Sequence, residues 1–395
     1  ILPEEMIIRD YLIDIIKKTY GSFGFLSIET PAMEHIENLL SKQGGDNEKL
    51  IFKVLKRGEK LKLEGISDEN ELVDAGLRYD LTLPLARYYS NNLSSLPSPF
   101  KALQIGNVYR ADRPQRGRFR QFTQCDIDIL GEASNLAEIE LILATTKALS
   151  RIAKGKKFTV RINDRRILLS MALFAGYQDE NINNVFIILD KMDKIGMEGV
   201  KRELCELEGE EKANRYLGLF NGLDSDLDSV ISLKEKLEGF IEEDVLDNLC
   251  EIMDTVMEVK EGDFNLEFDP ALVRGMGYYT GTIFEVSMEG FSGSVAGGGR
   301  YDKMIGKFTG NDTPACGFSI GFERIITILM DAGFKIPDEN KKIAILYEKN
   351  VDSYTLKSIL KEAQSLRKSG NTVLVSKMNK NKKFQKEGLM QQGFT

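Results

Sequence analysis

The chain has 395 residues, and at about 150 residues per domain this length predicts two or three domains. Apolar residues make up 42% and charged residues 29%. This balance is typical of globular proteins and excludes a chain that is disordered over its whole length. One histidine, His35, and four scattered cysteines exclude a multi-histidine metal site and predict neither a metal centre nor a disulfide framework. No stretch reaches the ~18 apolar residues of a membrane helix and no export signal is visible at Ile1, so we expect no membrane partner and a cytoplasmic location.

The charge of the chain is unevenly distributed, although the net value is −8. Residues 341–395 carry 12 Lys and Arg against 4 Asp and Glu, whereas the whole chain carries 53 against 61. A basic C-terminal part on an acidic body indicates a partner with a phosphate backbone. A lysine-rich solvated surface is the alternative, and charge alone favours it.

The first third of the chain predicts a helix, a strand and then a long β-hairpin. Apolar residues at helical spacing after Pro3 predict a helix that ends near Gly21, and Phe25–Thr30 is expected to form a strand. Further strands are expected at Phe100–Arg110 and Arg118–Leu130, and an arginine-rich link joins them into the hairpin.

The middle of the chain predicts a helical segment that interrupts the strands. A helix over 135–153 and a strand over 157–162 precede a mostly helical, acidic stretch, 165–258, which we interpret as an inserted domain. The elements expected after it are strands at 272–279 and 282–288, then a glycine-rich segment at 293–299 and a helix at 322–332.

The part of the chain beyond Pro337 predicts a small α/β domain. A strand at 343–347, a helix to about residue 368 and a strand at 372–376 form the β-α-β beginning of such a domain. This beginning is too short to close a core of its own, so we expect the domain to be incomplete.

The second strand of the hairpin carries polar residues on one face. Because alternate residues of a strand share a face, six side chains should point the same way: Arg118, Arg120, Phe122, Gln124, Asp126 and Asp128. Arg110 and Asp112, at the end of the partner strand, are likewise two residues apart. Arginines bind phosphate oxygens in bidentate fashion, whereas Gln and Asp suit an amine or an imidazole N–H. A solvent-facing surface of alternating charge is the alternative, which the aromatic residues nearby disfavour.

Three further motifs follow in the last third of the chain. Leu272–Gly281 places Arg274 before adjacent tyrosines, and on its own a strand with a bulge and a buried tyrosine explains it. Gly297–Asp302 begins with three glycines that permit close approach to the backbone, although a plain loop is the simpler interpretation. Gly317–Arg324 delivers an arginine to the first turn of a helix, where side chain and helix dipole together suit a triphosphate. No Walker A sequence occurs, which excludes a P-loop nucleotide fold.

Taken together in chain order, these motifs resemble the class II aminoacyl-tRNA synthetases. Gly24-Phe25-x-x-Ile28-x-x-Pro31 is similar to their motif 1, Tyr109–Asp112 with the strand after it to motif 2, and Gly317–Arg324 to motif 3. The stretches between them resemble the histidyl-tRNA synthetase family in particular, and they are Arg78–Pro84, Gln124–Asp128, Arg274–Tyr279 and Gly298–Asp302. The collinear combination is far more specific than any single motif.

The resemblance implies an α+β fold. The expected architecture is the class II synthetase antiparallel sheet flanked by helices, with a helical insertion and a partial C-terminal α/β anticodon-binding domain. The implied segments are a catalytic core in 1–164 and 259–335, the insertion in 165–258 and the anticodon-binding domain in 341–395. Motif 1 builds the subunit interface in this family, so the resemblance also implies a homodimer.

The resemblance further implies that histidine and ATP form histidyl-adenylate and that the acyl group then passes to tRNA(His), with Mg²⁺ accompanying ATP. It assigns catalytic roles to Arg110 and Arg274, and ATP contacts to Arg110, Asp112 and Arg324. The residues that it implies for histidine binding are Asp80, Thr82, Gln124, Asp128, Tyr278, Tyr279 and Tyr301. Such a site fits the chemistry, because a carboxylate nucleophile needs no general base and the charge that develops at phosphorus needs positioned cations.

Two relatives of the same fold are alternatives. One is the non-catalytic, synthetase-like regulatory subunit of ATP phosphoribosyltransferase, which lacks the anticodon-binding domain, and the other is a stand-alone sensor of uncharged tRNA. The presence of Arg110, Arg274 and Arg324, and the β-α-β beginning after the linker, favour the enzyme. One departure from the family pattern is Gly277, which stands where an acidic residue is common and bears on the rigidity of that segment.

Overall fold

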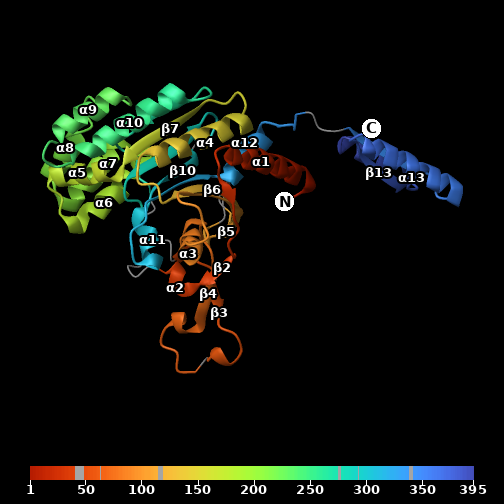
Figure 1. Ribbon diagram of the computed structural model, residues 1–395, viewed down its shortest axis with the longest axis horizontal. Coiled ribbons are helices and arrows are strands. Elements are labelled where there is room, and N and C mark those ends of the chain that lie inside the picture. Colours follow the sequence, from red (N-terminus) through yellow and green to blue (C-terminus); the bar gives the residue numbers. More distant parts are fainter. Residues whose placement is uncertain (41–48, 63, 114–118, 275–276, 292, 338–340) are drawn as a thin grey trace. The chain divides into compact units, whose positions relative to one another are not determined.

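The computed structural model describes residues 1–395 except 41–48, 63, 114–118, 275–276, 292 and 338–340 (Figure 1). The chain divides into two compact units, Ile1–Gly333 and Phe334–Thr395. Within the described ranges, no helix combines the length and the apolar character that a membrane span requires.

An eight-stranded sheet forms the centre of the first unit. Its strand order is β1-β5-β6-β11-β10-β9-β7-β8, and the pairs from β5 to β7 are antiparallel, whereas β1 and β8 pair in parallel at the two edges. The strands are β1 (Leu26–Ser27), β5 (Phe100–Tyr109), β6 (Gln121–Leu130), β7 (Phe158–Asp164), β8 (Asn265–Phe268), β9 (Thr282–Met288), β10 (Ser294–Arg300) and β11 (Ala315–Ile320). The expected antiparallel sheet is confirmed.

Three helices flank this sheet: α1 (Pro3–Ser22), α4 (Leu136–Ile152) and α12 (Phe322–Asp331). Helix α1 contacts both α4 and α12, and α4 in turn contacts β6 and β11 (Figure 1). The helical spacing of Leu12, Ile16 and Tyr20 puts these side chains on one face of α1, where each is fully buried. The apolar periodicity thus accounts for both the helix and the surface that it buries.

A smaller sheet lies beside the start of helix α3 (Thr82–Asn92). It has the order β2-β4-β3, with β2 (Met33–His35), β3 (Lys53–Leu55) and β4 (Val73–Leu77). The short elements around it are α2 (Ile36–Leu39), η2 (Gly58–Lys60) and η3 (Glu69–Leu72), and α3 packs against α11 (Asp302–Thr309). His35, the single histidine, is exposed at the end of β2.

Between β7 and β8 the chain forms only helices in the described residues, as the sequence predicts for 165–258. They are α5 (Arg165–Ala175), α6 (Asp179–Leu189), α7 (Met192–Glu208), α8 (Glu210–Gly218), α9 (Leu227–Lys236) and α10 (Glu243–Val259). Figure 1 shows them gathered together in green and yellow-green. Helix α10 contacts α4 and β7, which attaches the helical segment to the central sheet.

The second unit contains β12 (Lys342–Tyr347), α13 (Ser353–Lys368), β13 (Thr372–Lys377) and α14 (Lys382–Gln391). Strands β12 and β13 pair in parallel, which confirms the predicted β-α-β arrangement. Helix α14 was not predicted, and none of its residues is buried. Among the described residues of this unit, the buried apolar side chains are Ala363 and Val373, so its core is small.

Two predictions for the central sheet are wrong. The described residues of 272–279 form a turn and irregular backbone instead of a strand, and the centres of the Tyr278 and Tyr279 rings lie 4.8 Å apart. Neighbouring residues of a strand point to opposite faces, so this ring contact requires a turn. Conversely, Gly297–Asp302 is not a plain loop, because Ser294–Arg300 is strand β10 and Asp302 begins helix α11. A Cβ on Gly298 would lie 1.9 Å from the carbonyl oxygen of Gly317, so close strand packing requires glycine there.

Candidate active site

A cavity of about 410 Å³ opens where β6, β10 and β11 meet the first residues of α3 and α12. All eleven residues to which the sequence resemblance gives a role line this cavity: Asp80, Thr82, Arg110, Asp112, Gln124, Asp128, Arg274, Tyr278, Tyr279, Tyr301 and Arg324. They come from segments separated by as much as 244 positions in the sequence numbering, Asp80 to Arg324. The sheet therefore brings the separate motifs to one place.

Two of the arginines in the cavity are held by backbone carbonyl groups. Arg110 follows β5, its Nε donates a 2.9 Å hydrogen bond to the carbonyl of Tyr79, and its guanidinium lies 5.0 Å from the centre of the Phe122 ring. Arg324 lies in the first turn of α12 and donates from Nη1 to the carbonyl of Ser294. The first turn of a helix adds the positive end of its dipole, so Arg324 stands where an anion is favoured.

Arg274 reaches the cavity from the segment that precedes β9. Its Nη1 donates a 2.7 Å hydrogen bond to Oε2 of Glu285, and its side chain is 22% exposed. Nε of Arg274 is buried and has no hydrogen-bond partner among the described residues. A Cβ on Gly297 would lie 2.5 Å from Nη1 of Arg274, so the middle of β10 needs a glycine to make room for this guanidinium.

Asp128 on β6 forms the buried polar centre of the cavity. Its Oδ1 accepts a 2.6 Å hydrogen bond from the Tyr301 hydroxyl, while Oδ2 is buried without a partner in the described part of the chain. Burial raises the pKa of Asp128 to about 7, although the hydrogen bond from Tyr301 opposes this rise. A Cβ on Gly317 would lie 2.0 Å from Oδ1, which explains the small residue opposite Asp128 on β11.

Asp80 and Gln124 add two more acceptors that nothing described in the chain satisfies. Oδ1 of Asp80 accepts a 3.2 Å bond from the backbone N–H of Leu83, but Oδ2 is buried without a described partner, and burial raises the pKa of this carboxyl. Oε1 of Gln124 is likewise buried without a described hydrogen-bond partner. Buried acceptors are normally paired, so this group calls for a ligand that brings several N–H donors.

Asp126 and Ser319 are site residues to which the sequence analysis gave no role. Ser319 donates to Oδ1 of Asp126, and Nε2 of Gln124 lies 3.4 Å from Oδ2 of Asp126. Asp126 is 4% exposed, and burial together with the nearby Asp128 charge raises its pKa well above the ordinary value. The alternation along β6 did place Asp126 on the same face as Asp128, and that was the available signal.

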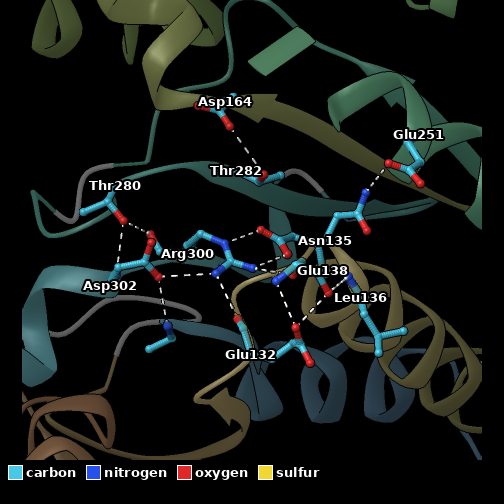
Figure 2. A network of polar contacts seen from close by, with 12 residues as sticks. Glu132, Asn135, Leu136, Glu138, Asp164, Glu251, Thr280, Thr282, Arg300 and Asp302 are labelled. Carbon is cyan, nitrogen blue, oxygen red and sulfur yellow. Dashed lines mark hydrogen bonds and ion pairs between the residues drawn. The ribbon is translucent and has the colours of Figure 1, made fainter. Parts of the chain in front are cut away.

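Arg300, within the Gly-Gly-Gly-Arg-Tyr-Asp motif, belongs to the scaffold behind the cavity. Its Nε and Nη2 each donate a 2.6 Å bond to the carboxylate of Glu138 on α4, and Nη1 lies 3.4 Å from Asp302 (Figure 2). Nη1 and Nη2 also donate to the carbonyls of Glu132 and Ser134. These contacts attach the end of β10 to α4 and so bring the next residue, Tyr301, into the cavity.

The described residues contain no group of three or more His, Cys, Asp and Glu arranged to hold a metal ion. Glu323 lines the cavity next to Arg324, but both its oxygens accept from Arg9 of α1, and Oε1 also accepts a 3.0 Å bond from the backbone N–H of Thr123. Its carboxylate therefore joins α1, β6 and α12, and both of its oxygens already accept hydrogen bonds within the chain.

The antiparallel sheet, with Arg110 beside its hairpin and Arg324 at the start of α12, defines a class II aminoacyl-tRNA synthetase core. Residues 1–325 match the family model described as histidyl-tRNA synthetase. The chain belongs to the histidyl-tRNA synthetase family.

Known relatives agree with this membership. The chain is 44% identical over 338 residues to the histidine–tRNA ligase of Leifsonia xyli subsp. xyli, covering 83% of this chain and 78% of that one. It is 42% identical over 373 residues to the probable histidine–tRNA ligase of Tropheryma whipplei, covering 91% and 84%. The crystal structure of histidyl-tRNA synthetase from Nostoc sp. PCC 7120 superimposes with a TM-score of 0.79 at 29% identity, covering 100% of this chain and 88% of that one.

Proposed function

We propose that this chain is a histidine–tRNA ligase, which activates histidine with ATP to histidyl-adenylate and transfers it to tRNA(His). The observation that carries the proposal is a single cavity lined by three arginines together with buried acceptors that lack described partners. Cations of this kind suit a triphosphate, and the acceptors suit a small ligand with an ammonium group and an imidazole. Histidine and ATP together satisfy both groups.

The arginines have separate roles in this proposal. Arg110 holds the α-phosphate while the histidine carboxylate attacks phosphorus and pyrophosphate leaves, and Arg324 holds the γ-phosphate. Arg274 bridges the histidine carboxylate and the α-phosphate, and Asp112 contacts the adenine side. Fixed cations cost no reorganisation as charge develops, so adenylation requires positioning and electrostatic stabilisation instead of proton abstraction.

The acceptors recognise histidine. Asp80, Thr82 and Gln124 hold its α-ammonium group, which brings donors to the two buried oxygens that lack described partners. Asp128 and Tyr279 contact the imidazole, and an imidazole N–H directed at Oδ2 of Asp128 would satisfy that atom. Tyr278 and Tyr301, whose rings lie 6.1 Å apart, close the pocket. An amino acid without these donors leaves the acceptors unpaired, which is a strong basis for rejection.

The remaining parts of the proposal concern partners and location. Mg²⁺ would arrive with ATP and be held chiefly by its phosphates and by water, as Mg²⁺ commonly is, since Glu323 is already used by Arg9. A homodimer would cover Leu26 and Met33 around motif 1, which are 50% and 54% exposed in the single chain. The four cysteines are free, which supports a cytoplasmic location, and the basic 341–395 segment supports tRNA contact as the anticodon-binding part.

The test is ATP–pyrophosphate exchange measured with each amino acid in turn at fixed Mg²⁺. Exchange that depends on histidine and on no other amino acid supports the ligase, and aminoacylation of tRNA(His) then tests the second step. Histidine binding without any exchange would instead point to the regulatory-subunit alternative. That alternative has less support, since the relatives at 42–44% identity are histidine–tRNA ligases and the combined regulatory subunit/synthetase structure from Bacillus halodurans is 21% identical.

A further inference from the structure

Glu285, on β9, has no role in the resemblance and does not line the cavity, yet it holds a residue that does. Its Oε2 accepts the 2.7 Å hydrogen bond from Nη1 of Arg274, and its Oε1 accepts a 2.6 Å bond from Nη2 of Arg161 on β7. The Glu285 side chain is 17% exposed. Each carboxylate oxygen accepts from a different arginine, so the carboxylate is fixed between two guanidinium groups.

The sheet determines where Glu285 stands. Arg161 and Glu285 are directly opposite each other in the antiparallel pair of β7 and β9, so strand register makes them neighbours. Arg161 is itself held by Asp269, whose Oδ2 accepts a 3.1 Å bond from Nη1. Asp193 on α7 lies farther, at 3.7 Å, and its side chain is 78% exposed, so it adds little.

Arg274, by contrast, stands on backbone that is neither helix nor strand in the described residues around it. The glycine at 297 leaves space for the guanidinium but supplies no hydrogen bond to aim it. A long side chain on irregular backbone has several rotamers available, and a charged hydrogen bond from one side selects among them. Glu285 supplies such a bond from the rigid sheet.

We propose that Glu285 is a positioning residue for Arg274 in the adenylation reaction, and that Arg161 fixes Glu285 in turn. Glu285 holds one edge of the guanidinium, so that the remaining N–H groups face the histidine carboxylate and the α-phosphate. The inference rests on the proposed function, because it assigns a partner to an arginine whose role is part of that function.

Glu285→Gln tests the proposal, since it keeps the size of the side chain and removes its charge. We expect kcat of histidine-dependent exchange to fall on the order of 10²-fold, with a smaller change in KM for ATP, because Arg110 and Arg324 remain in place. Glu140→Gln is the matched control: its side chain is 27% exposed, it pairs with Lys101, and it lies outside the cavity lining. Equal kcat in Glu285→Gln and Glu140→Gln would overturn the inference, whereas no exchange in the unmodified protein would overturn the proposed function instead.

A double-mutant cycle separates positioning from a general loss of structure. Calorimetry would measure binding of a non-hydrolysable histidyl-adenylate analogue to the unmodified protein, Glu285→Gln, Arg274→Ala and the double variant. We expect Glu285→Gln to weaken binding when Arg274 is present and to have no further effect when it is absent. An equal loss in both backgrounds would show that Glu285 does not act through Arg274. Unchanged kcat in Arg161→Ala would remove Arg161 from the proposal.

Discussion

Two arginine networks adjoin the same cavity and differ in how many donors the protein itself uses. Arg300 donates from Nε, Nη1 and Nη2 to carboxylates and backbone carbonyls (Figure 2). Arg274 donates from Nη1 to Glu285 and retains a buried Nε without a described partner. A guanidinium whose donors are used by its own chain stabilises the fold, whereas one with a donor left over at a cavity is available to a ligand.

The first prediction concerns the loss of the buried ion pair between Arg300 and Glu138. Glu138→Gln leaves the Arg300 charge buried without its carboxylate, and Glu138 is 1% exposed, so we expect the free energy of unfolding to fall by about 3–5 kcal/mol. Urea unfolding measures this value. The control is Asp14→Asn, which breaks an exposed pair with Lys18 and should cost about 0–1 kcal/mol. Similar losses in the two variants would contradict the structural role given to Arg300.

The second prediction is that a change at Arg274 lowers activity without lowering stability. Arg274→Ala removes a cation that is positioned for the transition state, so we expect kcat of pyrophosphate exchange to fall about 10²–10³-fold. The thermal midpoint should change little, because Glu285 keeps its bond to Arg161. Exchange kinetics and a thermal melt on the same preparation test both statements. Unchanged exchange would remove the catalytic role of Arg274.

Gly297→Ala displaces the Arg274 guanidinium without removing it. The added Cβ would meet the guanidinium, which is the movable end of a long side chain, so we expect a fold-preserving loss of kcat on the order of 10²-fold. Gly298→Ala is the contrast, since its Cβ would meet the backbone of β11 and should lower stability instead. If the two alanine variants lose activity and stability in the same proportion, the assignment of Gly297 to Arg274 is wrong.

The buried Asp128 gives the stability of the protein a pH dependence. Burial raises the pKa of Asp128 to about 7, so the folded ligand-free protein keeps a proton that the unfolded chain releases near pH 4. Between these values the unfolded state binds fewer protons, and the free energy of unfolding therefore falls as pH rises. Asp128→Asn should reduce this slope by about 1.4 kcal/mol per pH unit. Unfolding curves from pH 4 to 7 measure it, and an unchanged slope would contradict the raised pKa.

Much of the fold and site could be predicted because the relevant signals are local. Apolar spacing located α1, α4 and α12, and alternation along β6 placed Gln124, Asp126 and Asp128 on one face. The conformation of Gly297–Gly299 was missed for a non-local reason. Glycine favours loops by its own conformational freedom, whereas in β10 Gly297 leaves room for the Arg274 guanidinium and Gly298 for the backbone of β11.

The ion-pair partners of the arginines in and behind the site could not be predicted from local sequence patterns either. Glu285 and Arg161 are 124 positions apart, and only the register of β7 with β9 makes them neighbours. The same holds for Arg300 and Glu138, which are 162 positions apart. A single sequence shows which residue types are present, but it does not show which ions pair across the sheet.

The position of His35 has a practical consequence for spectroscopy. The 395 residues contain one imidazole, which is exposed on β2 and is not among the residues that line the cavity. The background in a nuclear magnetic resonance spectrum of the protein with bound histidine would therefore come from a single imidazole ring, and His35→Gln would remove it. The tautomer and protonation state of the bound amino acid could then be observed directly while its neighbour Asp128 titrates.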